Sequence, residues 1–492
     1  MPFFETISKL WPIIPRMACL VSACAMLAAC GEEATGPGSS ENNPDNVVLI
    51  VVSNLSPADI DTPSTDEAPT PNIDVLAAQG VRFLNAYTSA SVSVPARMSL
   101  YTGRTPAQLG FEYDMPTTDT IGVDLTRGQT LLPGMLKQSG YVTGFVGAWG
   151  LGGVGGQGGD YPGRQGFDEV YAVIPPVAPY GDDAPAEWQF IPTTNFQQPP
   201  VRKEESRILT GSAAKPAKNA EYAILGFAQQ AVDFIDRHQK ETFFLTVSLP
   251  GIDEPLQVPK DYWDRFAGIA DPNMRMRAAM IAALDDAVGN IVRSLDNRGL
   301  AEKTLIVLTS FAGCNAEVGL CQCGTLRSGA VSLYEGGLRV PLIMRYPRRY
   351  KPRTQFTPPV VASDLVPTIL NDVGAKRPLG TVIDGVALSD YITGAKPGAP
   401  HEALAWSRKP ASAMRLGDYK VVNDPDKYPS LEIYDLVDDP AEQNNLAEAR
   451  PELAPELSAR LKIETASGTE PRWLSKGQVN LTGCGENLSI YK

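Results

Sequence analysis

The sequence predicts an α/β fold: a large mixed, mostly parallel sheet sandwiched by helices, followed by a small C-terminal antiparallel sheet plus a helix. The run VVLIVV at residues 47–52 is typical of a strand buried on both faces, as in a parallel sheet. Strand-like runs then alternate with helix-like segments up to about residue 400. Beyond that point short runs replace this alternation, which indicates a separate small sheet.

Local patterns predict the individual elements. Apolar residues in the segment 221–239 recur at helical spacing, which favours an amphipathic helix. We expect further helices at 70–78, 131–139 and 274–296, and further strands at 81–87, 141–147, 243–249, 305–308 and 340–344. The small sheet would use 412–415, 419–422 and 431–434, with a helix at 451–463 packed on it.

Composition limits the classes of function. The chain of 492 residues has a net charge of −13 and no long basic stretch, which argues against nucleic acid as a partner. It contains two histidines, His238 and His401. Few sites for imidazole-based catalysis or metal binding are therefore available.

The first residues are typical of an export signal. Lys9 and Arg16 precede an apolar run that is too short to span a membrane, and the segment ending in Cys30 is similar to a bacterial lipobox. We therefore expect an exported bacterial lipoprotein on the outer-membrane or periplasmic side, held to the membrane by a lipid on Cys30. A plain cleaved signal is the alternative. The predicted organisation is a signal peptide at 1–30, a flexible tether at 31–44, the α/β domain at 45–400, the small subdomain at 401–465 and a tail at 466–492.

Cysteine usage fits an oxidising compartment. Four cysteines remain after the signal: Cys314, Cys321, Cys323 and Cys484. Two disulfides with three possible pairings are expected, and a bridge from Cys314 to Cys321 or Cys323 would staple the loop between them. A four-cysteine zinc site is the alternative, although the spacing lacks paired C-x-x-C motifs.

The segment from Ser93 to Arg97 (SVPAR) is a candidate anion site. Pro95 restricts the residue before it to extended geometry, so Ser93 would lie on the turn that enters a helix. Helix N-termini favour anions, and Arg97 adds a planar donor group. The alternative is an ordinary helix start with no ligand.

From about residue 46 to 465 the chain resembles the sulfatase family, part of the alkaline phosphatase superfamily. The resemblance rests on ordered motifs: TPNID at 70–74, GVRF at 80–83, SVPAR at 93–97, TGR at 102–104, GFD at 166–168, LDD at 284–286, LYEGGLRVP at 333–341 and YDL at 434–436. It implies that Ser93 is the precursor of a formylglycine whose hydrate attacks sulfur, and that Arg97 holds this group. It also implies a calcium or magnesium ion, a histidine acid and sulfate-binding lysines.

The sequence departs from the family at most of those positions. The family's metal-binding carboxylates fall at Ser53, Asn54, Phe311 and Ala312, which would leave no metal site. Its Lys and His after the strand at 141–147 become Ala148 and Gly150. A second His becomes Asp253, and a second Lys falls near Ala330.

These departures favour a non-catalytic, sulfatase-like lipoprotein that binds a small anionic ligand or a protein partner and needs no cofactor. Phe311 and Ala312 would then close the former active site. The alternative is a sulfuric ester hydrolase of the arylsulfatase type that uses Ser93 with calcium or magnesium. Asn54, Asp59, Asp253 and Glu317 are its candidate substitute groups. A second alternative is a phosphoesterase of the same superfamily with Ser93 unmodified.

Overall fold

The fold is described from a computed structural model of the 492-residue chain. The structure describes residues 46–60, 70–113, 128–151, 162–173, 222–252, 256–315, 323–428 and 430–466, with short pieces at 189–190, 207–210, 213–216, 468–469, 471, 478–483 and 486–491. The predicted signal peptide with Cys30, the tether, Cys321 and Cys484 lie outside these residues.

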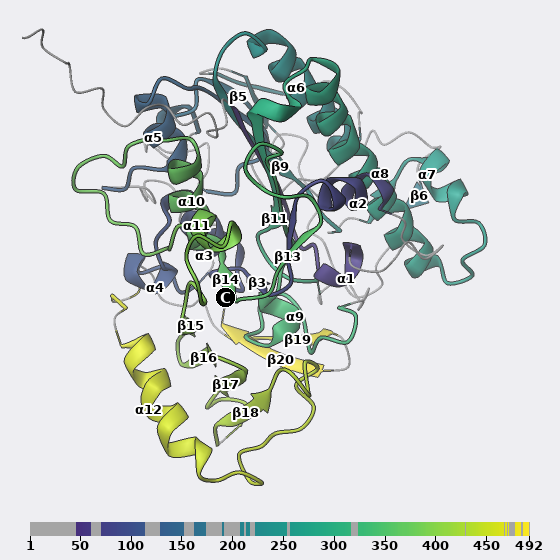
Figure 1. The fold of residues 1–492 in the computed structure, drawn as a ribbon. Coiled ribbons are helices and arrows are strands. Elements are labelled where there is room, and N and C mark those ends of the chain that lie inside the picture. The colour runs from purple at the N-terminus through teal and green to yellow at the C-terminus, as the bar shows by residue number, and fades with distance from the viewer. Residues whose placement is uncertain are drawn as a thin grey trace, which may run out of the picture. The chain divides into compact units, whose positions relative to one another are not determined.

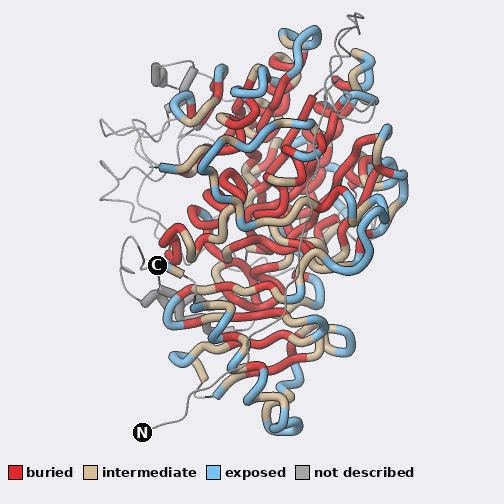
Figure 2. The backbone as a smooth tube through the Cα atoms, turned by 60° about the vertical axis from the view of Figure 1, so that its left-hand side comes forward, coloured by how far each residue is buried: buried red, intermediate tan, exposed pale blue. Residues whose placement is uncertain are grey.

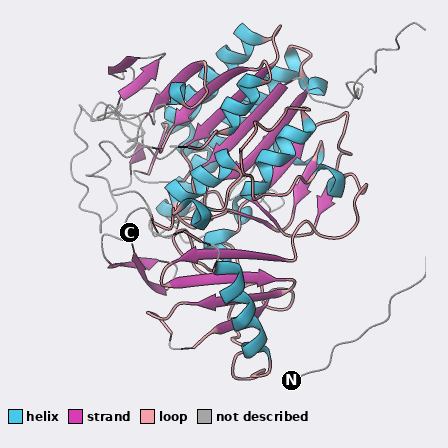
Figure 3. Cartoon of the chain, turned by 90° about the vertical axis from the view of Figure 1, so that its left-hand side faces the viewer, coloured by secondary structure: helices cyan, strands magenta, loops and turns pink. Residues whose placement is uncertain are grey.

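The predicted fold class is confirmed by a large mixed sheet (Figures 1 and 3). Within the described residues its strand order is β13-β2-β12-β11-β1-β9-β4-β5-β7-β8. The central strands β11, β1, β9, β4 and β5 run parallel, whereas β12, β7 and β8 pair antiparallel with their neighbours. The bounds are β1 Asn46–Val52, β2 Val81–Phe83, β4 Val142–Ala148, β5 Glu169–Val173, β7 Arg207–Thr210, β8 Ala213–Pro216, β9 Phe243–Leu249, β11 Thr304–Ser310, β12 Leu342–Arg345 and β13 Thr354–Phe356.

Strand β1 supplies side chains to both layers of the core. All seven of its residues are buried. Val48, Ile50 and Val52 pack into one apolar cluster, and the alternate residues of β1 pack into a second cluster on the opposite face. Because successive side chains of a strand point to opposite faces, a continuous apolar run is what a doubly covered strand requires.

Helices cover both faces of the sheet, and Figure 2 shows the buried backbone between them. One face packs against α2 Pro71–Ala78, α6 Ala223–His238, α7 Lys260–Arg265 and α8 Pro272–Asn297. The other packs against α3 Ser93–Thr102, α5 Leu132–Gln138 and α10 Leu365–Asp372. None of the described helices combines the length and the apolar character needed to cross a membrane.

Side chains fix the starts of two helices. The carboxylate of Asp271 accepts hydrogen bonds from the backbone N–H groups of Asn273 and Met274, which caps α8. Within α8, buried Asp285 accepts from the backbone N–H groups of Asn72 and Ile73 at 3.1 and 2.8 Å and so caps α2. Burial raises the pKa of Asp285 despite these bonds.

Several predicted boundaries differ from the structure. The strand predicted at 81–87 is two strands, β2 and β3 Ala86–Tyr87, because β3 leaves the large sheet and pairs with β14 Val360–Val361. The remaining short elements are α1 Pro57–Ile60, α4 Pro106–Leu109, α9 Glu335–Leu338, α11 Ser389–Ile392, β6 Gln189–Phe190, β10 Gln257–Val258, β19 Gln478–Gly483 and β20 Glu486–Tyr491, with 3-10 turns at Pro162–Arg164, Ala301–Lys303 and Ala362–Asp364.

The small antiparallel sheet is also present, with one strand more than predicted. It contains β15 Ala403–Arg408, β16 Ala411–Leu416, β17 Tyr419–Asn423 and β18 Glu432–Asp435. Helix α12 Leu453–Thr465 packs on one face through Leu457 and Leu461. The opposite face, including Trp406 and Tyr434, packs against Tyr87 and residues 333–338 of the large domain.

A buried ionic cluster joins the small sheet to the large domain. Lys420 of β17 has no exposed side-chain area, and its Nζ lies 2.8 Å from Glu335 Oε1 and 3.4 Å from Glu442 Oε1. Glu335 Oε2 accepts from the hydroxyl of Tyr87 at 2.8 Å, and Glu442 Oε2 accepts from the N–H of Glu335 at 2.7 Å. One lysine therefore balances two buried carboxyl groups from different parts of the chain.

The two carboxyl groups titrate differently. Burial opposes ionisation of Glu335, but the positive charge of Lys420 prevails and lowers its pKa. Burial, together with repulsion from Glu335, raises the pKa of Glu442 to about 7. Lys420 and Glu335 thus form the charged pair, and Glu442 is the group that gains or loses a proton near neutrality.

Replacing Lys420→Met should destabilise the protein strongly, because Glu442 would stay buried without its cation and Glu335 would keep only Arg339, at 3.9 Å. We expect a loss of about 3–5 kcal/mol in the free energy of unfolding, measured by denaturant titration. Arg460→Met is the matched control, because Arg460 pairs with Glu402 and Glu464 at the surface and its loss should leave the midpoint near that of the wild type. Equal midpoints for the two variants would contradict the role of Lys420.

The raised pKa of Glu442 predicts a specific pH dependence. The pKa of Glu442 is higher in the folded state than in the unfolded state, so the folded state binds this proton more tightly. As the pH rises from the ordinary pKa of a glutamate to about 7, the stabilisation from this bound proton is therefore lost. From pH 5.5 to 8 the free energy of unfolding of the wild type should fall by about 2 kcal/mol more than that of Glu442→Gln. Parallel stability curves for the two proteins, measured by denaturant unfolding at several pH values, would refute this.

Candidate functional site

The candidate site lies where the central parallel strands end. In β1 and β11, Val52 is paired with Ser310, so Ser53–Asn54 and Phe311–Ala312 leave the same edge of the sheet. The Phe311 N–H donates to Val52 O at 3.0 Å, and the Ser53 N–H donates to Leu249 O at 3.1 Å. The ends of parallel strands are where α/β folds place their ligand sites.

Arg97 reaches this edge from helix α3. Arg97 is only 4% exposed, and its guanidinium group donates hydrogen bonds to neutral oxygens at several strand ends. The Nε atom lies 3.2 Å from Ser93 Oγ. The terminal nitrogens lie 3.2 Å from Ala148 O, 3.4 Å from Trp149 O, 3.3 Å from Ser248 Oγ and 3.4 Å from Ser53 Oγ. Arg97 thus ties α3 to the ends of β1, β4 and β9.

The ring of Phe311 covers the guanidinium group of Arg97. The central carbon of the group lies 3.8 Å from the ring centroid, a cation–π arrangement. Phe311 is 3% exposed and Ala312 is 6% exposed. A phenyl ring and a methyl group therefore occupy two of the positions where the resemblance to the sulfatase family implies metal ligands.

Ser93 is the accessible part of the motif. It is exposed and is the first residue of α3, with Val92 as the N-cap in extended geometry. The helix thus begins two residues before Pro95, which occupies its first turn, where a proline is tolerated. The prediction that the residue before Pro95 is extended and that Ser93 lies on a turn ahead of the helix is wrong, because Ser93 and Val94 already belong to α3. The side chains of Ser93 and Arg97 lie 3.2 Å apart.

The other substituted positions are packed into the same region. The carbonyl of Ala148 accepts from both Arg97 and the hydroxyl of Ser248. Gly150 lies against Arg97 so closely that a Cβ atom there would be 2.6 Å from Nε. Ala330 is buried, and its N–H donates to Cys314 O at 2.7 Å.

The substitute metal ligands are not brought together within the described part of the chain. Asp59 is 2% exposed and pairs with Arg277, while it also accepts from the Ser56 N–H at 2.7 Å. Burial raises the pKa of Asp59, and Arg277 opposes the shift. Asp253 and Glu317 lie outside the described residues. Among the residues that are described, no three His, Cys, Asp or Glu side chains could hold a metal ion together.

A disulfide follows the site. Cys314 is bonded to Cys323, one of the two predicted bridges to Cys314. It staples the segment after Ala312, and two of the four sulfur atoms of the alternative zinc site are therefore not free thiolates. The hypothesis of a four-cysteine zinc site is thus wrong.

Some contacts at this site could not be read from the sequence. The stacking of Phe311 on Arg97 joins residues more than 200 positions apart, and Ser248 gave no motif signal. The sequence signal was indirect: Phe311 follows a predicted strand at a position where the family resemblance implies a metal ligand, and Arg97 belongs to the SVPAR motif.

The close contact between Gly150 and Arg97 gives a prediction. Gly150 has φ +64°, so Gly150→Ala should strain the backbone and also displace Arg97. Gly140 is the matched control, because it has φ +88° and nothing within 4 Å of an added Cβ. We expect Gly140→Ala to cost about 1 kcal/mol and Gly150→Ala clearly more, measured by denaturant unfolding. Equal losses of stability would show that Arg97 can move away from the added methyl group without destabilising the protein.

Comparisons with known proteins agree with the motifs. The model of the Sulfatase family matches residues 45–375, and that of the N-sulphoglucosamine sulphohydrolase C-terminal region matches residues 331–466. The N-acetylgalactosamine-6-O-sulfatase of Bacteroides thetaiotaomicron is 26% identical, with 93% of this chain and 99% of that protein covered. Arylsulfatase A of Bos taurus is 28% identical, with 87% and 88% covered.

A solved structure shows the same fold. The crystal structure of Ps i-CgsB in complex with k-i-k-neocarrahexaose superposes with a TM-score of 0.76 at 26% identity. The alignment covers 88% of this chain and 94% of that one. The family match spans about two thirds of the sequence and includes the strands and the helix that build the Ser93–Arg97 site. The chain therefore belongs to the sulfatase family.

Proposed function

We propose that this sulfatase-family protein binds a sulfate ester through the exposed Ser93 end of its site and does not hydrolyse it. One observation carries the absence of hydrolysis: the Phe311 ring stacks on the Arg97 guanidinium at 3.8 Å, at the edge where the family's metal ligands would lie. The guanidinium is then both hydrogen-bonded and covered by a ring. Binding of the anion rests instead on exposed Ser93 at the N-terminus of α3.

The residues at this edge do not fit calcium or magnesium. Both cations take oxygen ligands, and their protein sites depend on carboxylates. Ser53 and Asn54 offer one hydroxyl and one amide, and Phe311 and Ala312 offer no donor atom. We therefore derive no catalytic step that uses a metal. Ala148 and Gly150 likewise supply neither a proton nor a positive charge.

The second candidate is a sulfuric ester hydrolase, and the comparisons taken alone favour it over the first. The matched family and the named relatives are sulfatases. Ser93 is exposed and lies in hydrogen-bonding contact with Arg97, as a formylglycine precursor would require. The overall similarity thus supports hydrolysis, whereas the residues at the sheet edge oppose it. No observation favours the phosphoesterase hypothesis.

Export and lipidation complete the proposal. The apolar run before Cys30 and the polar residues after it support an exported lipoprotein anchored through Cys30. The proposed site would then face the periplasm or the medium, where sulfate esters from outside the cell are accessible.

Binding and turnover of 4-nitrophenyl sulfate distinguish the two candidates. The protein is produced with a sulfatase maturase that oxidises serine to formylglycine and is measured with excess calcium, with Ser93→Ala as the control. We expect calorimetric binding that Ser93→Ala weakens, no calcium binding, and no release of nitrophenol above that of Ser93→Ala. Turnover that disappears in Ser93→Ala would establish the hydrolase. Absence of both binding and turnover would overturn the binding proposal.

A further inference from the structure

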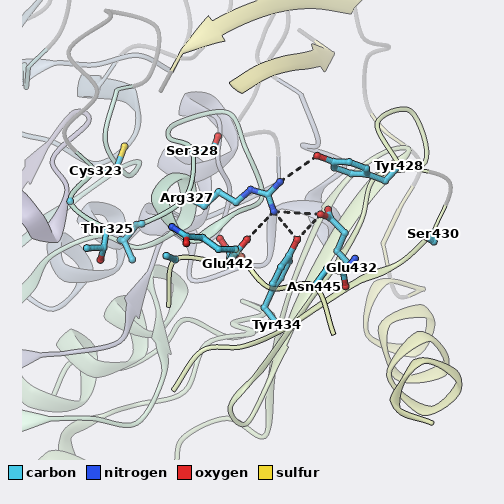
Figure 4. A pocket seen from close by; sticks show the side chains of 14 residues that line it. Cys323, Thr325, Arg327, Ser328, Tyr428, Ser430, Glu432, Tyr434, Glu442 and Asn445 are labelled. Atoms are coloured by element: carbon cyan, nitrogen blue, oxygen red, sulfur yellow. Dashed lines mark hydrogen bonds and ion pairs between the residues drawn. The ribbon is translucent and has the colours of Figure 1, made fainter. Parts of the chain in front are cut away.

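A separate pocket lies between the stapled segment and the small sheet (Figure 4). Its volume is about 760 Å³, within the range of roughly 300–1,000 Å³ that ligand sites occupy. One wall comes from residues 323–328, which follow the Cys314–Cys323 bond, and the other from residues 428–445. It shares no lining residue with the Ser93–Arg97 site.

The floor of the pocket is a fixed polar network. Arg327 donates to Tyr434 Oη at 2.7 Å and to the carbonyl of Glu442 at 3.2 Å, and it lies 3.4 Å from Glu432 Oε1. Glu432 in turn accepts from the hydroxyls of Tyr434 and Tyr334, both at 2.6 Å. Figure 4 shows Arg327 pointing between these side chains, which holds the floor in one arrangement.

Buried polar atoms beside the network still have bonding capacity. Ser328 lines the pocket and is 3% exposed, yet its hydroxyl has no hydrogen-bond partner. The Oε1 atom of Glu442, also in the lining, makes no hydrogen bond and has only the 3.4 Å ion pair with Lys420. Both atoms have almost no accessible surface, and Glu442 Oε1 faces the buried Lys420, so a ligand in the pocket would meet the accessible polar groups of the rim instead.

Neither kind of charged ligand suits this pocket. The aromatic rings already hold the chain's own cations: Arg327 lies 3.9 Å from the ring centre of Tyr334, and Lys427 lies 5.1 Å from that of Tyr428. A ligand cation would be repelled by these two positive charges, whereas a neutral ligand would not. An anion would meet the carboxyl groups of Glu432 and Glu442, and the nearest cation, Arg327, is already bonded to the floor.

The rim offers a different chemistry. Tyr428 presents a partly exposed ring, and Gln443, Asn445, Ser430 and Thr325 supply exposed amides and hydroxyls that can both donate and accept. The Tyr428 ring can pack against apolar C–H groups, and the neutral groups around it can bond to hydroxyls. This combination matches a ligand that carries hydroxyl groups on an apolar frame.

We propose that this pocket binds a neutral sugar residue, with its hydroxyl groups toward Arg327 and the exposed polar side chains of the rim and a C–H face on the Tyr428 ring. The inference does not depend on whether the Ser93–Arg97 site hydrolyses sulfate esters. It assigns the protein a second binding site, formed only where the large domain and the small sheet meet.

The test is binding of small neutral sugars by the full exported chain. Calorimetry and saturation-transfer NMR would use methyl β-D-galactopyranoside and methyl β-D-glucopyranoside, with sodium sulfate and tetramethylammonium chloride as charged comparators. We expect at least one sugar to bind and neither ion to compete with it. Preferential binding of either ion, or no binding of either sugar, would overturn the proposal.

Variants locate the binding. Tyr428→Ala should weaken sugar binding by about tenfold or more through loss of the ring, whereas Tyr428→Phe should retain most of it. Tyr391→Ala is the matched control, because Tyr391 also has a lysine 4.6 Å from its ring centre but lies outside the pocket. Ser93→Ala should leave sugar binding unchanged. Equal affinity in Tyr428→Ala and the wild type, with circular dichroism confirming the fold of both, would place the sugar elsewhere and refute the proposal.

Discussion

Burial of the central parallel strands on both faces is the constraint on which the rest of this structure depends. A strand covered by helices on both sides cannot expose a polar side chain along its length, so polar contacts are confined to its ends. In β1, all seven residues are buried and the first loop residues are Ser53 and Asn54. Because β11, β1, β9 and β4 are parallel, their loops meet at one edge, and α3 brings Arg97 to it.

At that edge a buried cation is held by neutral oxygens and an aromatic ring. Arg97 donates to carbonyl and hydroxyl oxygens, and the Phe311 ring supplies a further favourable contact to its positive charge. A guanidinium group with a planar set of donors links several strand ends at once. The motif therefore stabilises the fold whether or not Ser93 reacts.

The small sheet depends on a second buried charge. Lys420 reaches from β17 to Glu335 in the large domain and to Glu442 beyond β18. This cluster and the apolar contacts of Trp406 and Tyr434 hold the two walls of the Arg327 pocket at a fixed separation. The pocket is thus a product of the interface and would not exist in either part alone.

The sequence alone determined the family, the fold class and most elements. Buried strands and amphipathic helices have local periodicities, and the family is identified by the order of its motifs along the chain. Even β9, Phe243–Leu249, was predicted residue for residue. Through the family resemblance it also predicted that Ser53, Asn54, Phe311 and Ala312 lie where the family has metal ligands. Only the tertiary structure decided which side chains meet: the Phe311 ring on Arg97, the bridge from Cys314 to Cys323 and the pocket around Arg327. Those contacts join residues from separate elements, and no local periodicity encodes which side chains meet when strands and loops converge.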